Sequence, residues 1–243
     1  MRIIHTRSAW LALLACALVI SGCGGGSAPG PVSTQATAAP ARATRHRARP
    51  AHRRVKPRPA PPSNLPSRGL GRLPQTSQLP SGSSPELTAE MRALWRAVVS
   101  DSLAPGLPAF FPEAAYAQVK AIADPRADFA ARLLGDYRLD LGAAHRLLGA
   151  DPGSAQFVRV IVPAAHWVPP GACYNRIGYY EVPNSRLVYR QGGVMRSFGI
   201  ASMISWRGVW FVVHLGAVVR SGSTGVVDDP ATGPGVSIPS STC

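Results

Sequence analysis

The chain has 243 residues and a formal net charge of +14, from 26 lysine and arginine and 12 aspartate and glutamate residues. The charge is uneven, because residues 24–85 hold ten basic and no acidic side chains, whereas residues 86–243 hold fourteen and twelve. The basic excess therefore belongs to a tail. A domain of nearly balanced charge lacks the basic surface of a nucleic-acid-binding domain, so we exclude nucleic acid as a partner.

Residues 1–22 have the parts of a bacterial export signal. Two arginines form a short basic region, residues 10–20 form an apolar stretch too short to span a bilayer, and the sequence ISGC follows at residues 20–23. This arrangement resembles a lipoprotein signal peptide with its lipobox. The resemblance implies cleavage before Cys23, diacylglyceryl transfer to its thiol, and lipid anchoring at the outer face of the cell membrane. The alternative is an ordinary secretory peptide with an incidental cysteine.

Residues 23–83 are rich in Pro, Ala, Ser, Arg and Thr and contain no aromatic or acidic side chain. Such a segment buries too little apolar area to offset its ordering entropy, so we expect a disordered linker after the lipid anchor. Its densest basic block, residues 42–58, would be attracted to anionic lipid or to an acidic envelope polymer. A solvated linker without a partner is the simpler interpretation. His46 and His52 in this block lack the spacing of a metal site.

The folded part should begin with helices. The sequence SSPE at residues 83–86 has a serine cap, an early proline and a glutamate three residues after Ser83, which together mark a helix start. Apolar residues then recur at helical spacing up to about Ser102, which predicts one amphipathic helix. A second helix should follow Pro112, and Asp124-Pro125 should cap a short third one.

After residue 136 the pattern predicts mainly strands. Apolar and charged residues alternate over 137–141, as in a strand, and helical spacing then returns up to Gly149. Residues 157–162 should form a short strand, and residues 166–171 a loop. The residues beyond 218 are rich in Ser, Gly, Thr, Pro and Asp and should form an extended or mobile C-terminal tail, residues 219–243.

Residues 174–218 consist of apolar, β-branched and aromatic runs separated by Pro183-Asn184, Gly192-Gly193 and Arg207-Gly208. Such runs are typical of an antiparallel meander. A two-residue loop at 207–208 would place the following pairs opposite each other: Trp206 with Val209, Ile204 with Phe211, Ser202 with Val213 and Ile200 with Leu215.

Side chains alternate across a strand, so this meander has a second, smaller face that is also largely apolar. It should hold Gly199, Ala201, Met203, Ser205, Trp210, Val212 and His214. A face in contact with water would carry a polar row, so we expect helices, a ligand or a second subunit to cover it. A homodimer through this face is one alternative.

The order of elements indicates a single α+β domain, residues 84–218, with N-terminal helices packed on a curved antiparallel sheet. It resembles the NTF2-like fold shared by nuclear transport factor 2, ketosteroid isomerase and many polyketide-cyclase-like proteins, and residues 206–214 look like the last hairpin of that fold. The sequences PAFFPE at 108–113, HWVPPG at 166–171 and CYNRIGYY at 173–180 are similar to segments of uncharacterised actinobacterial exported lipoproteins. The resemblance implies a pocket between helices and sheet.

His214, Trp210, Met203 and Tyr180 are our candidates for lining such a pocket. In the register above, His214 lies opposite Ala201, where its imidazole could act as a base or bind a ligand; a hydrogen-bonded core histidine is the alternative. The sequence contains no recognisable nucleophile motif, zinc-ligand spacing or phosphate loop, so we assign no catalytic residue, metal or cofactor.

The expected function is accordingly a non-enzymatic binding or scaffold domain for a partner protein or a small apolar ligand. The alternative is an envelope isomerase or hydrolase that uses His214.

Export also bears on the cysteines. Cys16 would leave with the signal peptide and Cys23 would be acylated, which leaves Cys173 and Cys243 as a candidate disulfide in an oxidising compartment. Closing this loop of about 70 residues would contribute roughly 4 kcal/mol in the chain-entropy model. The alternative is that Cys243, at the end of a tail, never reaches Cys173.

Overall fold

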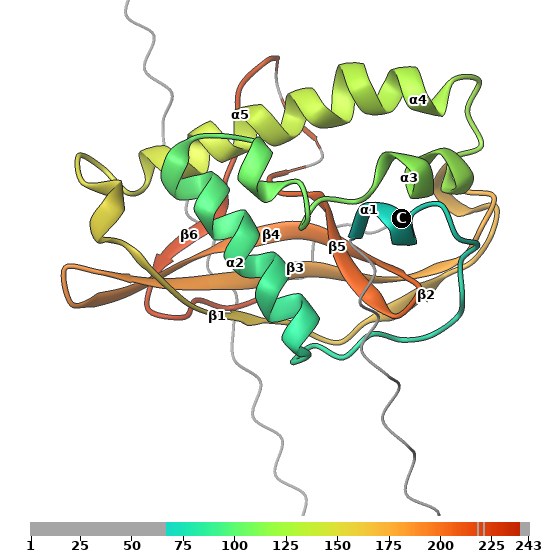
Figure 1. The fold of residues 1–243 in the computed structure, drawn as a ribbon. Coiled ribbons are helices and arrows are strands. Elements are labelled where there is room, and N and C mark those ends of the chain that lie inside the picture. The colour runs from blue at the N-terminus through green and yellow to red at the C-terminus, as the bar shows by residue number, and fades with distance from the viewer. Residues whose placement is uncertain (1–66, 218, 221, 239–243) are drawn as a thin grey trace, which may run out of the picture. The chain divides into compact units, whose positions relative to one another are not determined.

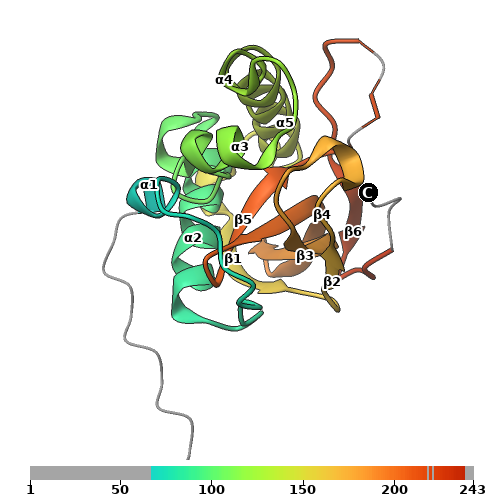
Figure 2. The same cartoon turned by 90° about the vertical axis from the view of Figure 1, so that its right-hand side faces the viewer.

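The computed structural model describes residues 67–217, 219–220 and 222–238, which form an α+β domain. Helices lie against a six-stranded antiparallel sheet (Figures 1 and 2). The helices are α1 (Ser67–Leu70), α2 (Pro85–Ser100), α3 (Glu113–Val119), α4 (Pro125–Asp128) and α5 (Leu134–Arg146). The strands are β1 (Gln156–Ile161), β2 (His166–Val168), β3 (Tyr179–Gln191), β4 (Val194–Trp206), β5 (Val209–His214) and β6 (Asp228–Thr232). No helix among these residues is long and apolar enough to cross a membrane.

The helix starts predicted from the sequence are confirmed. The Ser84 side chain caps α2 by accepting a hydrogen bond of 3.1 Å from the Leu87 amide. Helix α3 follows Pro112, and the Asp124 side chain caps α4 by accepting from the Ala127 amide at 2.9 Å.

The prediction of a strand at residues 137–141 is wrong, because this segment is part of α5. Helix α4 continues through a π-helical turn, Phe129–Leu133, directly into α5. Buried residues recur at helical spacing along this helix and just beyond its end, and they are Phe129, Leu133, Tyr137, Asp140, Leu141, Ala143, Ala144 and Leu148. The helix buries side chains at its own spacing, and the alternation of apolar and charged residues over 137–141 does not produce a strand.

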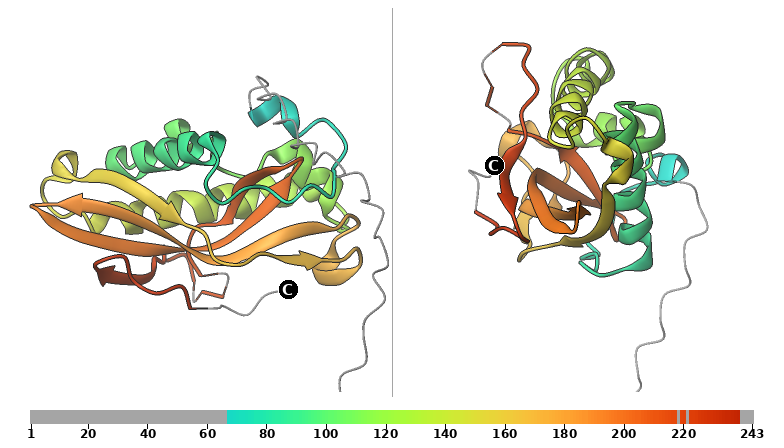
Figure 3. Two further views of the ribbon diagram at one scale, coloured as in Figure 1. Left: turned by 90° about the horizontal axis from the view of Figure 1, so that it is seen from below. Right: turned by 90° about the vertical axis from the view of Figure 1, so that its left-hand side faces the viewer.

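The sheet has the order β1-β3-β4-β5, with β2 paired to β3 and β6 paired to β4. Two hairpins are tight, since both central residues have positive φ at Gly192-Gly193 (56° and 77°) and Arg207-Gly208 (53° and 78°), as a type I′ turn requires. Pro183-Asn184, by contrast, does not interrupt the chain of β3, although Asn184 has a φ of 47°. Figure 3 shows β3 and β4 extending together along the sheet.

The predicted register of the last hairpin holds only near its turn. Trp206 pairs with Val209 and Ile204 with Phe211, as expected, but Ser202 pairs with His214 instead of Val213. The shift lies between Ser202 and Met203, because β5 has one extra residue there, a β-bulge. His214 is therefore opposite Ser202 and not Ala201.

Both boundaries of the folded domain extend beyond the predicted ones. Residues 67–83, expected in the linker, contact the sheet: the Trp206 indole donates to the Leu70 carbonyl at 2.9 Å, and the Gln75 side-chain amide donates to the Ser205 carbonyl at 2.8 Å. At the other end, residues 228–232 form β6 and pair with β4, so this part of the expected tail is a strand.

The smaller face of the meander is covered by the chain itself. Met203 and Trp210 are 0% and 2% exposed, and both belong to the single hydrophobic core that includes the helices. The face therefore offers no apolar surface for a second subunit at these residues.

Candidate functional site

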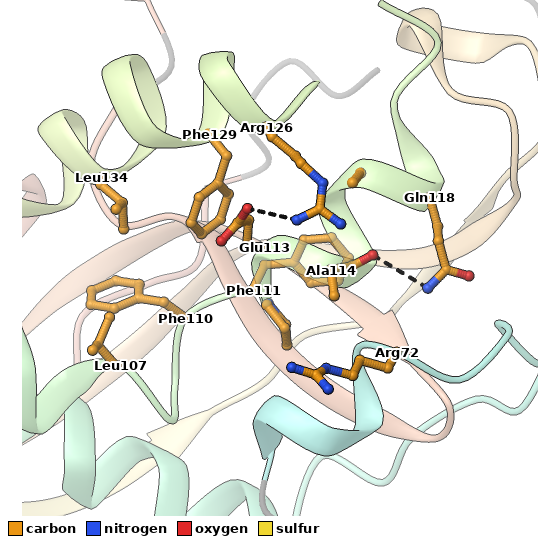
Figure 4. A pocket seen from close by; sticks show the side chains of 12 residues that line it. Arg72, Leu107, Phe110, Phe111, Glu113, Ala114, Gln118, Arg126, Phe129 and Leu134 are labelled. Atoms are coloured by element: carbon orange, nitrogen blue, oxygen red, sulfur yellow. Dashed lines mark hydrogen bonds and ion pairs between the residues drawn. The ribbon is translucent and has the colours of Figure 1, made fainter. Parts of the chain in front are cut away.

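A groove of about 820 Å³ opens between α3, the α4–α5 helix and the turn that follows α2 (Figure 4). Its wall is mainly apolar, formed by Leu107, Phe110, Phe111, Pro112, Ala114, Ala117, Phe129 and Leu134. The polar residues that line it are Arg72, Glu113, Gln118 and Arg126. This size and this mostly apolar lining are typical of small-ligand sites.

The aromatic wall is held by the edge of the sheet. The Phe111 amide donates to the Val212 carbonyl and the Val212 amide donates to the Ala109 carbonyl, both at 2.9 Å, so residues 109–111 run beside β5 like an added strand. This backbone pairing orients Phe110 and Phe111 to opposite sides. Phe110 stacks on Tyr137 with 3.8 Å between ring centroids, and Phe111 meets Trp206 edge-on at 5.9 Å.

The opposite wall comes from the π-helical turn. The Leu134 amide donates to the Phe129 carbonyl, five residues back, which widens the helix at the position of Phe129. Phe129 lies 5.6 Å from the ring of Tyr116 on α3, and its side chain lines the groove. Inserted π-helical turns occur frequently at functional sites.

A polar network behind Phe129 joins α3 to α4. Arg132 donates to both oxygens of Asp128, at 2.9 and 2.7 Å, and to the Tyr116 hydroxyl at 2.8 Å, while that hydroxyl donates to Asp128. The hydrogen bonds from Arg132 hold the pKa of Asp128 below its usual value. Burial, together with the hydrogen bond to Asp128, raises the pKa of Tyr116. The network fixes the spacing between the two helices that border the groove.

The groove rim carries three charged side chains. Arg126 forms an exposed ion pair of 3.1 Å with Glu113. Arg72 reaches the groove from the segment after α1, and its guanidinium has no hydrogen bond or ion pair with any residue that the structure describes. The charged groups that line the groove therefore sum to one positive charge.

A second polar cluster lies at the β2–β3–β4 contact. The Glu181 carboxylate accepts a hydrogen bond of 2.7 Å from the Ser202 hydroxyl through Oε1, and its Oε2 lies 3.6 Å from His166 Nε2. Both Glu181 Oε2 and His166 Nε2 are buried without a hydrogen-bond partner among the described residues. Tyr179 belongs to the same cluster; burial, followed by the charge of Glu181, raises its pKa to about 12.

Comparison with protein-family models, with curated proteins and with solved structures gives no match.

None of the four residues predicted to line a pocket lies in the groove. Met203 and Trp210 are in the core, and Trp210 Nε1 has no hydrogen-bond partner among the described residues. Tyr180 packs edge-on against Trp167 with 5.0 Å between ring centroids. His214 is half-buried, and its imidazole makes no hydrogen bond within the described part of the chain. Burial, and then the charges of Arg132, Lys120 and Arg220, lower the pKa of His214 to about 4.

The sequence pattern does not predict the groove, although the segment that supplies its aromatic wall is recognisable in the sequence. The sequence PAFFPE at 108–113 supplies Phe110, Phe111 and Glu113, and two adjacent aromatic residues between prolines were the available signal. The other wall is separated from this segment by helix α3, so its proximity is a tertiary property.

The structure bears on two further predictions about site residues. Cys173 is disulfide-bonded. Cys243, its predicted partner, and Cys23, the predicted lipid attachment site, lie outside the described residues, so both assignments stay predictions. Within residues 67–217, 219–220 and 222–238, no group of three or more His, Cys, Asp or Glu side chains is arranged to hold a metal ion.

Proposed function

We propose that this chain is a lipid-anchored protein of the cell envelope whose NTF2-like domain binds a small apolar ligand in the groove between α3 and the α4–α5 helix. The observation that carries the binding proposal is the groove itself, with a volume of about 820 Å³ and an aromatic wall. The phenylalanine rings are largely buried, but Leu107, Ala117 and Leu134 are half-buried, and a ligand would remove their remaining apolar surface from water.

The NTF2-like assignment is supported by the helices packed on an antiparallel sheet and by the long β3–β4 and short β4–β5 hairpins. The envelope location is supported by the sequence ISGC at residues 20–23 and by the apolar stretch before it. The anchor has a direct test, in which Cys23→Ala should move the protein from the membrane fraction to the soluble extracytoplasmic fraction. Unchanged membrane association would contradict it.

The second candidate is an isomerase or hydrolase that uses His214. A pKa of about 4 would leave the imidazole neutral at physiological pH, as a general base must be. The described residues supply no hydrogen-bonded acid or base beside it, and His214 does not line the groove. The proposal therefore gives His214 no catalytic role, and binding explains more of the geometry.

The binding proposal can be tested by filling the groove. Ala114 and Ala117 on α3 are half-buried and line it, so Ala117→Trp and Ala114→Trp should each occupy ligand volume. The matched control is Ala89→Trp, because Ala89 is exposed on α2 and distant in sequence from the lining residues. All variants would be made in the processed chain carrying Cys23→Ser, which needs no detergent.

The measurement is titration calorimetry with decanoate and 1-decanol, supported by native mass spectrometry. We expect binding to the parent chain and to Ala89→Trp, and at least a tenfold weaker association for both groove variants. Far-ultraviolet circular dichroism and urea midpoints would establish that the variants fold. Equal affinity in folded variants, or no binding of either compound to the parent chain, would overturn the proposal.

A further inference from the structure

We propose that the ligand of the groove is a single-chain amphiphile with an anionic head group, a carboxylate or a phosphate, that pairs with Arg72. This inference rests on the proposed binding function and specifies its ligand class. The apolar chain would lie against the half-buried Leu107, Ala117 and Leu134, and the head group would lie at the rim.

The position of Arg72 is set by contacts on both sides of it. The residue before it, Gly71, offers its carbonyl to the Gln118 side-chain amide of α3 at 2.7 Å. Leu70 is buried, and its carbonyl accepts from the Trp206 indole at 2.9 Å. A side chain at position 71 would begin only 2.7 Å from Pro112 Cβ, so glycine permits this close approach to the start of α3. The backbone that carries Arg72 is therefore held at the groove.

The Arg72 side chain points in a direction that would let it contact a ligand head group at the groove rim. Figure 4 shows it extending from the segment after α1 toward Phe111, while Arg126 reaches toward Glu113 from the far side of the groove. The two arginines thus stand at different parts of the rim.

The charges select the sign of the head group. Arg126 is already paired with Glu113 at 3.1 Å, whereas Arg72 has no polar partner among the described residues. A guanidinium binds carboxylate and phosphate oxygens through two parallel N–H donors, a geometry that a neutral hydroxyl head group cannot match. A cationic head group would instead be repelled by the net positive rim. Charge complementarity thus favours an anion at Arg72.

The volume is sufficient for an alkyl chain. Small-ligand sites of about 300–1,000 Å³ hold molecules of drug size, and the groove, at about 820 Å³, falls in this range. Eight of the twelve residues that line the groove are apolar, and its charged side chains lie at the rim, so the part of the ligand away from the rim should be apolar.

The test compares four probes that share a ten-carbon chain: decanoate, decyl phosphate, 1-decanol and decylammonium. Titration calorimetry below the micellar concentration would use the processed Cys23→Ser chain. We expect both anions to bind about three- to tenfold more tightly than 1-decanol, because only they can pair with Arg72, and we expect decylammonium to bind most weakly. A tenfold change in affinity corresponds to about 1.4 kcal/mol. The ratio of the dissociation constants of decyl phosphate and decanoate then identifies which anion the site prefers.

Three substitutions assign the effect to one side chain. Arg72→Gln should lower the affinity for both anions to about that for 1-decanol. Arg92→Gln is the matched control, because Arg92 is exposed on α2 and does not line the groove. Arg126→Gln should have the smaller effect, because Arg126 is already paired with Glu113.

Each outcome has one meaning. Equal affinity for decanoate and 1-decanol in the parent chain would overturn the anionic head group while leaving the groove function intact. Loss of anion preference in Arg126→Gln but not in Arg72→Gln would overturn the assignment to Arg72. If none of the four probes binds, the proposed function itself fails.

Discussion

The Ser202 hydroxyl donates a hydrogen bond of 2.7 Å to the Glu181 carboxylate on the neighbouring strand, and both side chains are buried. The pair lies side by side because Glu181 pairs with Ile204 and Pro183 with Ser202 in the β3–β4 register. A buried carboxylate that loses its donor bears a desolvation cost that no hydrogen bond then offsets.

Ser202→Ala should therefore lower the free energy of unfolding by about 1–3 kcal/mol. Replacing Glu181 by leucine in the same chain should recover part of this loss, because no unpaired carboxylate would then remain. Urea unfolding of the two single variants and the double variant measures the coupling. Ser100→Ala, at an exposed position at the end of α2, is the control. The prediction is contradicted if Ser202→Ala lowers the free energy of unfolding no more than this control does.

Asp140 organises the loop between β5 and β6. Its carboxylate accepts from the Gly216 and Val226 amides, each at 2.9 Å, and from both terminal nitrogens of Arg220 at 2.7 and 2.9 Å. The side chains of Asp140 and Arg220 are 1% and 9% exposed. Among the described residues, removing Asp140 leaves the Arg220 guanidinium with only the longer ion pair of 3.8 Å to Asp136.

Asp140→Ala should cost about 3–5 kcal/mol of stability, the range for breaking a buried ion pair. Faster amide hydrogen exchange of Gly216 and Val226 should accompany the loss, because both amides donate to Asp140. Asp151→Ala, at an exposed position, provides the comparison. Unchanged exchange of the two amides would show that the loop is held by other contacts.

Glu90 is a buried carboxyl on α2, and one of its oxygens has no hydrogen-bond partner among the described residues. Burial, and then the charge of Glu86, raise the pKa of Glu90 well above its usual value. The folded state therefore keeps a proton that the unfolded state releases above about pH 4.5. Stability contributed by this group is present at low pH and is lost as the pH rises toward the folded-state pKa.

Glu90→Gln should for this reason raise the free energy of unfolding at pH 8 more than at pH 4.5. Urea denaturation at the two pH values tests the difference, with Asp151→Asn as a control for the loss of one negative charge at an exposed position. An equal change at both pH values would mean that Glu90 ionises normally in the folded chain.

His214 should produce a pH dependence of the opposite sign. Its pKa is about 4 in the folded protein and 6.5 without the surrounding structure, so between these values the unfolded state binds a proton that the folded state does not. Stability should decrease as the pH falls from 6.5 to 4, by at most about 1.4 kcal/mol per pH unit.

The comparison of the parent chain with His214→Gln isolates this contribution. The difference in unfolding free energy between the two proteins should be constant above pH 7 and change steadily below pH 6.5. Nuclear magnetic resonance titration of the imidazole gives the same pKa directly. A folded-state value near 6.5 would exclude the proposed effect of burial and of the neighbouring cations.

The sequence by itself determined the features that depend on neighbouring residues. The starts of α2 and α4 depend on residues within three positions, and the turns at Gly192-Gly193 and Arg207-Gly208 require only local positive φ angles, so both kinds of feature were predicted correctly. The serine that caps α2 is Ser84, one residue after the Ser83 of the predicted spacing. The coarse α+β class followed from the same local patterns. The lipobox at residues 20–23 is likewise a local signal, but it lies outside the described residues.

Only the tertiary structure decided the features that depend on distant contacts. The β-bulge that places His214 opposite Ser202 depends on how two strands pair, and the alternation of one strand cannot reveal it. Residues 137–141 form a helix because Tyr137 and Asp140 are buried against β5 and its following loop. The groove joins Phe110, Phe129 and Arg72, which come from three separate segments, and such convergence arises only when the chain packs.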